Sequence, residues 1–157
     1  LQVSLGLALL APIAAALAVG LRVVLGDGRP AEALVARTIG AGLVLSVGGG
    51  LGILAAFLGL GVPPVSGDVE IGDWLRIADF VIPAVIRVDR ISVTIALFSS
   101  LLTALIARFS RTYLHKEPGF IRFFTLLGVF ATGTQLVALA GALELFFAGW
   151  ELIGVSS

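Results

Sequence analysis

Two glutamates, Glu144 and Glu151, lie seven residues apart in an otherwise apolar stretch, residues 142–157. Seven residues make nearly two turns of an α-helix, so both carboxylates would project from one face, about 10 Å apart along the axis. If the helix begins at residue 142, Glu144 lies about 4 Å and Glu151 about 15 Å below the membrane surface. A carboxylate near the bilayer centre is costly unless it is protonated, paired or hydrated, which makes Glu151 a candidate functional residue.

The chemistry that these carboxylates could perform is proton transfer. A carboxyl group removed from water holds its proton more tightly, and an approaching cation makes it release that proton. We therefore predict that Glu151 is a proton relay and that Glu144, near the surface, passes protons to it. Two alternatives stay open: Glu151 could tie two helices together in a structural role, and Glu144 could simply be solvated.

Polar side chains in the two spans before these glutamates could hold water along a proton path. Each carries a hydroxyl or an amide group, which can donate and accept hydrogen bonds. Trp150 and the neighbouring Phe146 and Phe147 would keep much of the surroundings dry. The predicted polar path consists of Ser99, Ser100, Thr103, Thr132, Thr134 and Gln135.

The elements that must position these residues are membrane-spanning helices. The chain of 157 residues is 59% hydrophobic and 13% charged, and its mean hydropathy of +1.13 excludes an ordinary soluble domain. Continuous apolar runs without period-two alternation exclude barrel strands, so we predict an all-α integral membrane protein. Four segments carry no charge and are near or above the ~18 residues that a spanning helix needs: residues 1–21, 38–67, 91–107 and 123–143. The predicted single unit, residues 1–157, contains about five transmembrane helices, at about 2–22, 38–61, 90–109, 119–140 and 142–157.

The loop between the second and third helices, residues 62–89, is predicted to contain a short β-hairpin. Residues 69–77 and 85–90 alternate roughly between apolar and polar types. Residues 78–84 between them are too many for a tight two-residue turn, and Pro63 and Pro64 mark the end of the second helix. The alternative is an irregular loop along the membrane interface, anchored by Trp74.

The basic residues predict the orientation of the chain in its membrane. Seven of the ten lie in the first and third loops and none lies in the turn near Gly141, so the positive-inside rule assigns those loops to the cytoplasm. The second loop carries the other three, Arg76, Arg87 and Arg90, and offsets them with five acidic residues, Asp68, Glu70, Asp73, Asp79 and Asp89. The N-terminus would then face outward, in a bacterial inner or plasma membrane. A cleavable signal peptide is a weaker interpretation of residues 1–21, because no basic region precedes the apolar stretch. The basic residues of these loops are Arg22, Arg29, Arg37, Arg108, Arg111, Lys116 and Arg122.

The composition also excludes several kinds of site. The chain has no cysteine and one histidine, His115, so iron–sulfur clusters, cysteine zinc sites, disulfides and bis-histidine haem cannot form within it. We expect no metal and no cofactor in this chain, and no nucleic acid partner, since the net charge is zero. Any redox chemistry would belong to partners, so the chain would at most be a non-redox subunit of an enzyme complex that moves ions. His115 is expected at the surface, with a role in ion uptake as the alternative.

Two further features have structural interpretations. Glycines 48–50 and Gly52 in the second span indicate close helix packing, although a flexible break in a transport path is an alternative. Asp89, just before the third span, is expected to cap that helix or to pair with Arg90 rather than to relay protons.

Three stretches together resemble a known family. They are 88–92 "VDRIS", Tyr113 followed by 118–124 "PGFIRFF", and 147–154 "FAGWELIG". From about Gly67 onward the chain resembles the antiporter-like membrane subunits of respiratory complex I, subunit L type, and their relatives in multisubunit cation/proton antiporters. The resemblance implies an outward N-terminus, an outer β-hairpin and ion translocation, driven by quinone reduction in a partner module or by sodium/proton exchange. It also places Glu151 on the family's essential glutamate of the fifth helix, which pairs with a lysine two helices later.

Two departures from the family limit what the resemblance implies. Its members are much longer and carry intramembrane lysines, whereas Lys116 here lies in a loop; the remainder of a longer chain, or other membrane subunits, would have to supply them. A helix over residues 142–157 reaches only ~24 Å of the ~30 Å needed, so we expect the N-terminal portion of a longer subunit.

The second departure is Glu144, where the family usually has leucine. One branch of the family takes up inorganic carbon with a large soluble zinc protein, and that function is the main alternative to proton or sodium translocation. A structural anchor subunit without transport is the third possibility. The expected partners are the bilayer, other membrane subunits or the remainder of the same chain, and a soluble catalytic module.

Overall fold

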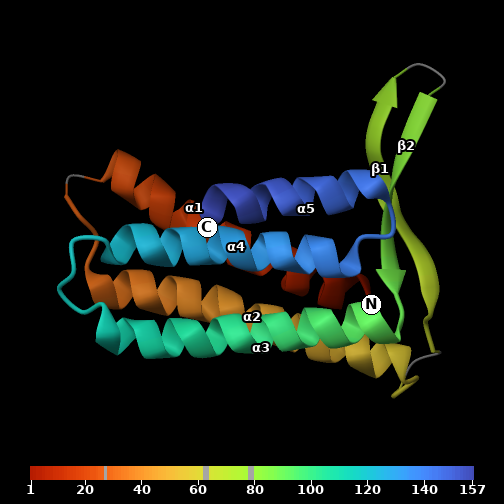
Figure 1. The fold of residues 1–157 in the computed structure, drawn as a ribbon, viewed down its shortest axis with the longest axis horizontal. Helices are drawn as coiled ribbons and strands as arrows, with labels where there is room; N and C mark the ends of the chain where they lie inside the picture. Colours follow the sequence, from red (N-terminus) through yellow and green to blue (C-terminus); the bar gives the residue numbers. More distant parts are fainter. Residues whose placement is uncertain (27, 62–63, 78–79) are drawn as a thin grey trace.

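The computed structural model describes residues 1–26, 28–61, 64–77 and 80–157. Within these residues the chain forms five helices and one two-stranded antiparallel sheet (Figure 1). The predicted fold class, helical with a hairpin between the second and third helices, is confirmed. In chain order the elements are α1 (Gln2–Leu25), α2 (Glu32–Phe57), β1 (Gly67–Ile77), β2 (Phe80–Val88), α3 (Arg90–Tyr113), α4 (Phe120–Leu139) and α5 (Leu143–Ser156).

Helices α1–α4 are long and apolar enough to cross a membrane, with 20 to 26 residues each. A span of the hydrocarbon layer needs about 20 residues. The 14 described residues of α5 are fewer than that, although the helix is equally apolar. The chain is therefore an integral membrane protein with four candidate spans among five helices.

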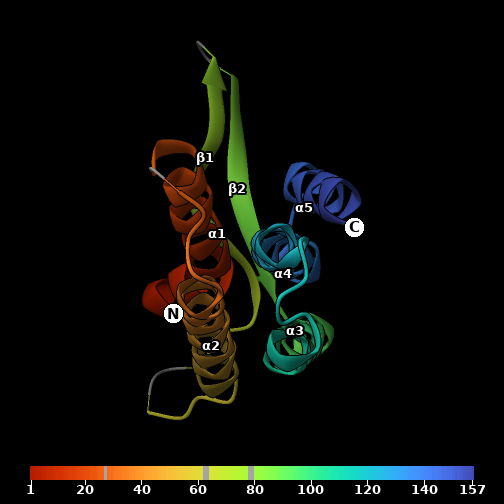
Figure 2. The ribbon, with the colours of Figure 1, turned by 90° about the vertical axis from the view of Figure 1, so that its left-hand side faces the viewer.

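Helices α1–α4 form a bundle whose main contacts run in the order α1, α2, α3, α4 and back to α1, and α2 and α4 also touch across it. The α1–α2 and α3–α4 connections lie at one end, and the hairpin and the α4–α5 connection lie at the other (Figure 1). We call these the arginine end and the hairpin end. Seen along the axis, α1 and α2 form one layer and α3, α4 and α5 form the other (Figure 2). Helix α5 lies outside the bundle and packs chiefly against α4.

The glycines of α2 let its backbone lie against that of α1. A Cβ added at Gly49 would lie 2.5 Å from the carbonyl oxygen of Ser4, and one at Gly42 would lie 2.8 Å from that of Ala11. Between these glycines the hydroxyl of Ser46 donates a hydrogen bond of 2.9 Å to the carbonyl of Ala8. Close packing, as predicted for this stretch, is therefore confirmed at Gly49, and α2 continues through it without a break.

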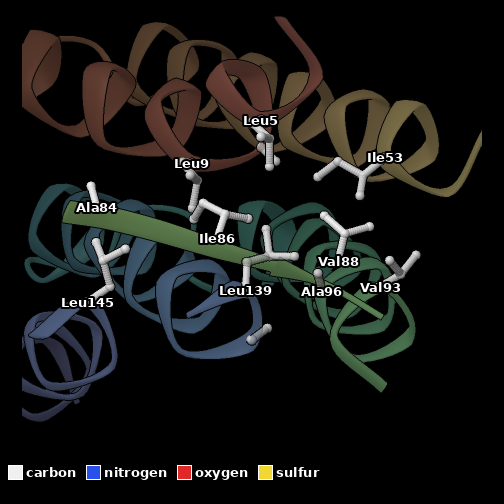
Figure 3. Packing of buried hydrophobic residues seen from close by; sticks show 12 residues of the cluster. Leu5, Leu9, Ile53, Ala84, Ile86, Val88, Val93, Ala96, Leu139 and Leu145 are labelled. Atoms are coloured by element: carbon white, nitrogen blue, oxygen red, sulfur yellow. The ribbon is translucent and has the colours of Figure 1, made fainter. Parts of the chain in front are cut away.

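Strand β2 closes the hairpin end of the bundle. Ala84, Ile86 and Val88 alternate with more exposed residues, and their side chains point between the two helix layers (Figure 3). Ile86 and Val88 are completely buried there. Their neighbours in this cluster come from every helix: Leu5, Leu9, Ile53, Val93, Ala96, Leu139 and Leu145 among them.

Main-chain contacts also join β2 to the α4–α5 connection. The amide of Gly141 donates a hydrogen bond of 2.9 Å to the carbonyl of Val85, and Ile86 forms an isolated bridge with Ala140. The hairpin is thus attached to the point where α5 begins.

The hairpin differs from the prediction in its connection. Residues 78–84 were expected to link the strands, but β2 already begins at Phe80 and includes Pro83, which lies opposite Asp73. Both strands of a two-stranded sheet are edges, where the missing N–H of a proline is tolerated, so Pro83 does not end the strand. The alternative of an irregular loop is wrong, since residues 67–77, Trp74 among them, form β1. Anchoring of Trp74 at the membrane interface stays a prediction. Residues 78 and 79, and Pro63 at the expected end of the second helix, lie outside the described residues.

The helix bounds also differ. Helix α2 spans Glu32–Phe57 where 38–61 was predicted, and α3 continues to Tyr113 rather than to 109. Charge-free segments underestimate helix length, because a carboxylate in the first turn and an arginine in the last turn stabilise a helix. Glu32 and Arg111 occupy these places, so α2 begins earlier and α3 ends later than predicted. At its other end α2 stops at Phe57 rather than at 61, because Gly59 adopts a left-handed conformation with φ 69° that ends the helix.

Candidate functional site

The candidate site is the face of α5 that carries Glu144 and Glu151. Helix α5 begins after Ala142, whose extended backbone breaks it from α4. Glu144 lies in the first turn, where the helix dipole favours a carboxylate. Glu151 lies seven residues further on, on the same face, and both residues are exposed.

Two glycines decide which way this face points. A Cβ at Gly149 would lie 2.9 Å from the carbonyl oxygen of Gly133, and a Cβ at Gly133 would lie 2.9 Å from that of Gly149. The backbones of α4 and α5 therefore touch at this pair. Each helical residue turns the side chain by about 100°, so Glu151 projects about 200° away from Gly149. The glutamates point away from α4.

Aromatic rings lie beside the glutamates. Phe146 and Trp150 meet edge to face, with ring centroids 6.0 Å apart, and Trp150 is 60% exposed. Phe147 is exposed as well. Among the described residues, neither glutamate has a hydrogen-bond or ion-pair partner. The carboxylates stand on an apolar surface that these described residues leave uncovered.

The predicted polar path lies elsewhere, between α3 and α4. Its centre is Gln135, 1% exposed, whose Nε2 donates to the carbonyl of Ala96 at 2.8 Å and to the hydroxyl of Ser99 at 3.1 Å. The Oε1 atom of Gln135 is buried without a partner among the described residues. The structure therefore brings together Gln135 and Ser99.

The other four residues of the predicted path bind within their own helices. The hydroxyls of Ser100 and Thr103 donate to carbonyls of α3, at 2.9 and 2.7 Å, and those of Thr132 and Thr134 donate to carbonyls of α4, at 3.3 and 2.8 Å. In the described part of the chain no hydrogen bond joins any of the six to Glu151. Helix α5, which carries the glutamate face, packs on one side of α4, and the residues of the predicted polar path lie on another side, between α3 and α4.

Charged groups at the hairpin end have structural partners. Asp89 accepts a hydrogen bond of 2.8 Å from the amide of Ser92 and so caps α3, as predicted. This backbone hydrogen bond lowers the pKa of the Asp89 carboxyl. On the hairpin, hydrogen bonds from Arg87 at 2.8 and 3.0 Å lower the pKa of Asp68, and the pKa of Arg87 is raised in return.

The arginine end contains a contact that the sequence does not predict. The Nδ1 atom of His115 lies 2.7 Å from a carboxylate oxygen of Glu32, and the backbone amide of Lys116 donates to the other oxygen at 3.1 Å. The contact joins the start of α2 to the α3–α4 connection. His115 is exposed, as expected. The first-turn position of Glu32 was the signal that it begins a helix, but nothing in the sequence pairs it with residues so distant.

The central part of the chain matches a known protein family. Residues 74–124 match the family described as NADH-ubiquinone oxidoreductase (complex I), chain 5 N-terminus. The matched segment runs from β1 through β2 and α3 into α4. It ends before Glu144 and Glu151.

Individual relatives agree with this match. The chain is 30% identical over 129 residues to an NAD(P)H-quinone oxidoreductase subunit 5 of Paulinella chromatophora, covering 82% of this chain and 18% of the relative. It is 30% identical over 84 residues to NADH-quinone oxidoreductase subunit L of Escherichia coli, covering 54% and 14%. With NADH-ubiquinone oxidoreductase chain 5 of Candida albicans it shares 26% over 89 residues, covering 57% and 16%. The chain thus spans less than a fifth of the length of these relatives.

Proposed function

We propose, on the premise that this chain resembles the N-terminal portion of the complex I antiporter-like membrane subunits, that it takes part in moving protons across a membrane. The similarity to chain 5 and subunit L supports the class of protein. The observation that carries the proposal for this chain is a carboxylate, Glu151, two turns into an apolar helix and on one face with Glu144.

In the proposed mechanism protons enter at the hairpin end and pass along α5. Glu144, in the first turn, takes up a proton, and Glu151 receives it about 10 Å deeper. That separation exceeds a direct hydrogen bond, so water must bridge the two carboxylates. Phe147 and Trp150 beside them would limit this water to a narrow file. Sodium is the alternative ion.

The direction of the glutamate face predicts where the driving charge must be. Because Gly133 and Gly149 hold α5 against α4, the carboxylates point outward from the bundle. A cation that lowers the proton affinity of Glu151 would have to approach from that side. We propose that a lysine of a neighbouring membrane subunit, or of a further part of the same polypeptide, supplies it, and that a soluble partner module holds the redox cofactors.

The orientation is part of the proposal. The arginine end would face the cytoplasm of a bacterium and the hairpin end, with the N-terminus, would face outward. The shared end of the α1–α2 and α3–α4 connections in Figure 1 agrees with that assignment of the loops.

The test is Glu151→Gln in the assembled complex, reconstituted in vesicles with a pH-sensitive dye inside. The variant keeps the side-chain size but cannot release a proton, so we expect proton flux to fall at least about tenfold. Glu117→Gln, in the exposed α3–α4 connection, removes the same charge and should leave the flux unchanged. Normal flux in Glu151→Gln, with normal assembly, would refute the relay.

Glu144 favours a second candidate function, energy-coupled uptake of inorganic carbon, because an acidic residue here departs from the leucine usual in respiratory members. Copurification of a large soluble zinc protein with this chain would support that function. If every carboxylate variant assembled and transported normally, the chain would instead be a structural anchor.

A further inference from the structure

A groove at the arginine end runs between α2 and α3. Its volume is about 530 Å³, within the range of sites that hold small molecules. Three arginines, Arg37, Arg108 and Arg111, line it, and no acidic residue does. Its other walls are apolar or small: Ala36, Gly40, Leu43, Val44, Leu101, Ala104, Leu105 and Ala107.

The charges and the apolar walls occupy different depths. Counted from the ends of the two helices, Arg111 lies about 3 Å and Arg37 and Arg108 about 8 Å from the arginine end. Val44 and Leu101 lie about 18 Å from it. Half of the hydrocarbon layer is about 15 Å thick, so the groove runs from the headgroup level to the bilayer centre. It has a cationic mouth and an apolar length.

The three arginines have no carboxylate partner among the described residues. Glu32, the acidic residue at the start of α2, is already bound by His115 and by the amide of Lys116. Other grooves at this end carry fewer arginines. The one beside α1 contains Arg22 alone, and the one between α1 and α4 contains Arg29 and Arg122. The α2–α3 groove therefore has the greatest positive charge at its mouth of these three.

We propose that this groove binds an anionic phospholipid, with the phosphate at the arginines and one acyl chain along the apolar walls. A guanidinium forms paired hydrogen bonds with phosphate oxygens and is charged at every physiological pH. Basic pockets between membrane helices at the headgroup level suit such lipids. The charge of the mouth and the length of the apolar walls together match a lipid better than free phosphate or a neutral helix. This inference does not depend on the proposed transport function.

The test compares two triple variants of the full-length protein, purified in detergent and titrated with phosphatidylglycerol and phosphatidylcholine by native mass spectrometry. The groove variant is Arg37→Gln with Arg108→Gln and Arg111→Gln. The matched control is Arg22→Gln with Arg29→Gln and Arg122→Gln, which removes the same charge from the same end. We expect the groove variant to lose at least about tenfold in phosphatidylglycerol binding and the control to retain it.

A second variant tests the apolar part of the groove. A Cβ at Gly40 meets nothing within 4 Å, so Gly40→Leu fills the groove without displacing a helix or removing a charge. It should weaken phosphatidylglycerol binding, and inorganic phosphate should not compete with the lipid in the unaltered protein. Equal losses in both triple variants would show attraction to the general positive surface. Phosphatidylglycerol binding that survives in the groove variant would also overturn the proposal; this result is expected if a neighbouring helix fills the groove. Competition by inorganic phosphate would overturn it as well.

Discussion

The α1–α4 bundle and helix α5 use the same kind of helix contact but differ in how much of their surface is covered. Both use glycines to bring two helix backbones together, at Gly49 in the bundle and at Gly149 on α5. Each bundle helix has neighbours on two sides, and β2 covers the hairpin end. Helix α5 packs chiefly on one helix, and its carboxylates are uncovered by the described residues. The chain therefore keeps the residues that hold its fold apart from the two glutamates that are predicted to relay protons.

The largest effect that would sharpen this comparison is expected for Gly49→Leu. The new side chain would press on the backbone of α1 near Ser4 and Ala8, which cannot move without opening the helix pair. We expect a loss of about 3 kcal/mol or more, and little protein in the membrane. Gly48→Leu, one residue earlier and facing open space, should be close to normal. Unfolding in mixed micelles would measure both variants.

The next effect is expected for Ile86→Ala in β2. Ile86 is fully buried between the two helix layers at the hairpin end. Its truncation leaves a cavity that lowers the free energy of unfolding by about 2–5 kcal/mol. Ile71→Ala, on the exposed part of β1, removes the same atoms and should cost much less. Similar thermal stabilities of the two variants would show that β2 does not close the bundle.

A smaller and local effect is expected for Gly149→Leu. A side chain there would collide with Gly133 and Leu136 and push α5 away from α4, costing about 1–3 kcal/mol of α5 packing while the bundle stays folded. Hydrogen exchange of amides in α5 should rise, with α1–α4 unchanged. Gly154→Leu, which meets open space, is the control. Exchange that rises in every helix would break the distinction between bundle and α5.

The smallest effect is expected at the cap of α3. Asp89→Ala removes the acceptor for the amide of Ser92 and should lower the Tm less than Ile86→Ala does. The pKa of Asp89 is lowered in the folded state, so its contribution to stability is present above the ordinary aspartate pKa of about 3.9. It is lost as the pH falls through the lower folded value. A difference between variant and parent that stays constant down to the lowest pH would contradict the cap's role.

Much of the bundle follows from local properties of the sequence. The length of the charge-free segments predicts the helices, and alternation around residues 69–77 predicts a strand. The exact bounds of the helices do not follow from these segments. Glu32 and Arg111 are charged and still lie inside α2 and α3, because their charges stabilise the first and last turns of a helix. Pro83 was a misleading signal, since its effect depends on whether a strand is an edge.

The site is predictable only in part. The spacing of Glu144 and Glu151 places them on one face whatever α5 touches. The direction of that face depends on the contact between Gly133 and Gly149, which lie sixteen residues apart and carry no pattern that singles them out. The same limit applies to Gln135, whose partners Ala96 and Ser99 are on another helix. The roles predicted for these residues stay predictions until the variants are measured.

The burial of β2 between the two helix layers determines when this part of the newly made chain can fold. Ile86 and Val88 are made after α2 and before α3, yet their cluster includes Leu5 from the first helix and Leu139 from the fourth. The hairpin end of the bundle cannot close until α4 has been made and has packed against β2. Contacts between residues so far apart in the chain form late and slowly. During that interval the apolar face of β2 is exposed, so the newly made chain is most vulnerable to misfolding between insertion of α3 and insertion of α4.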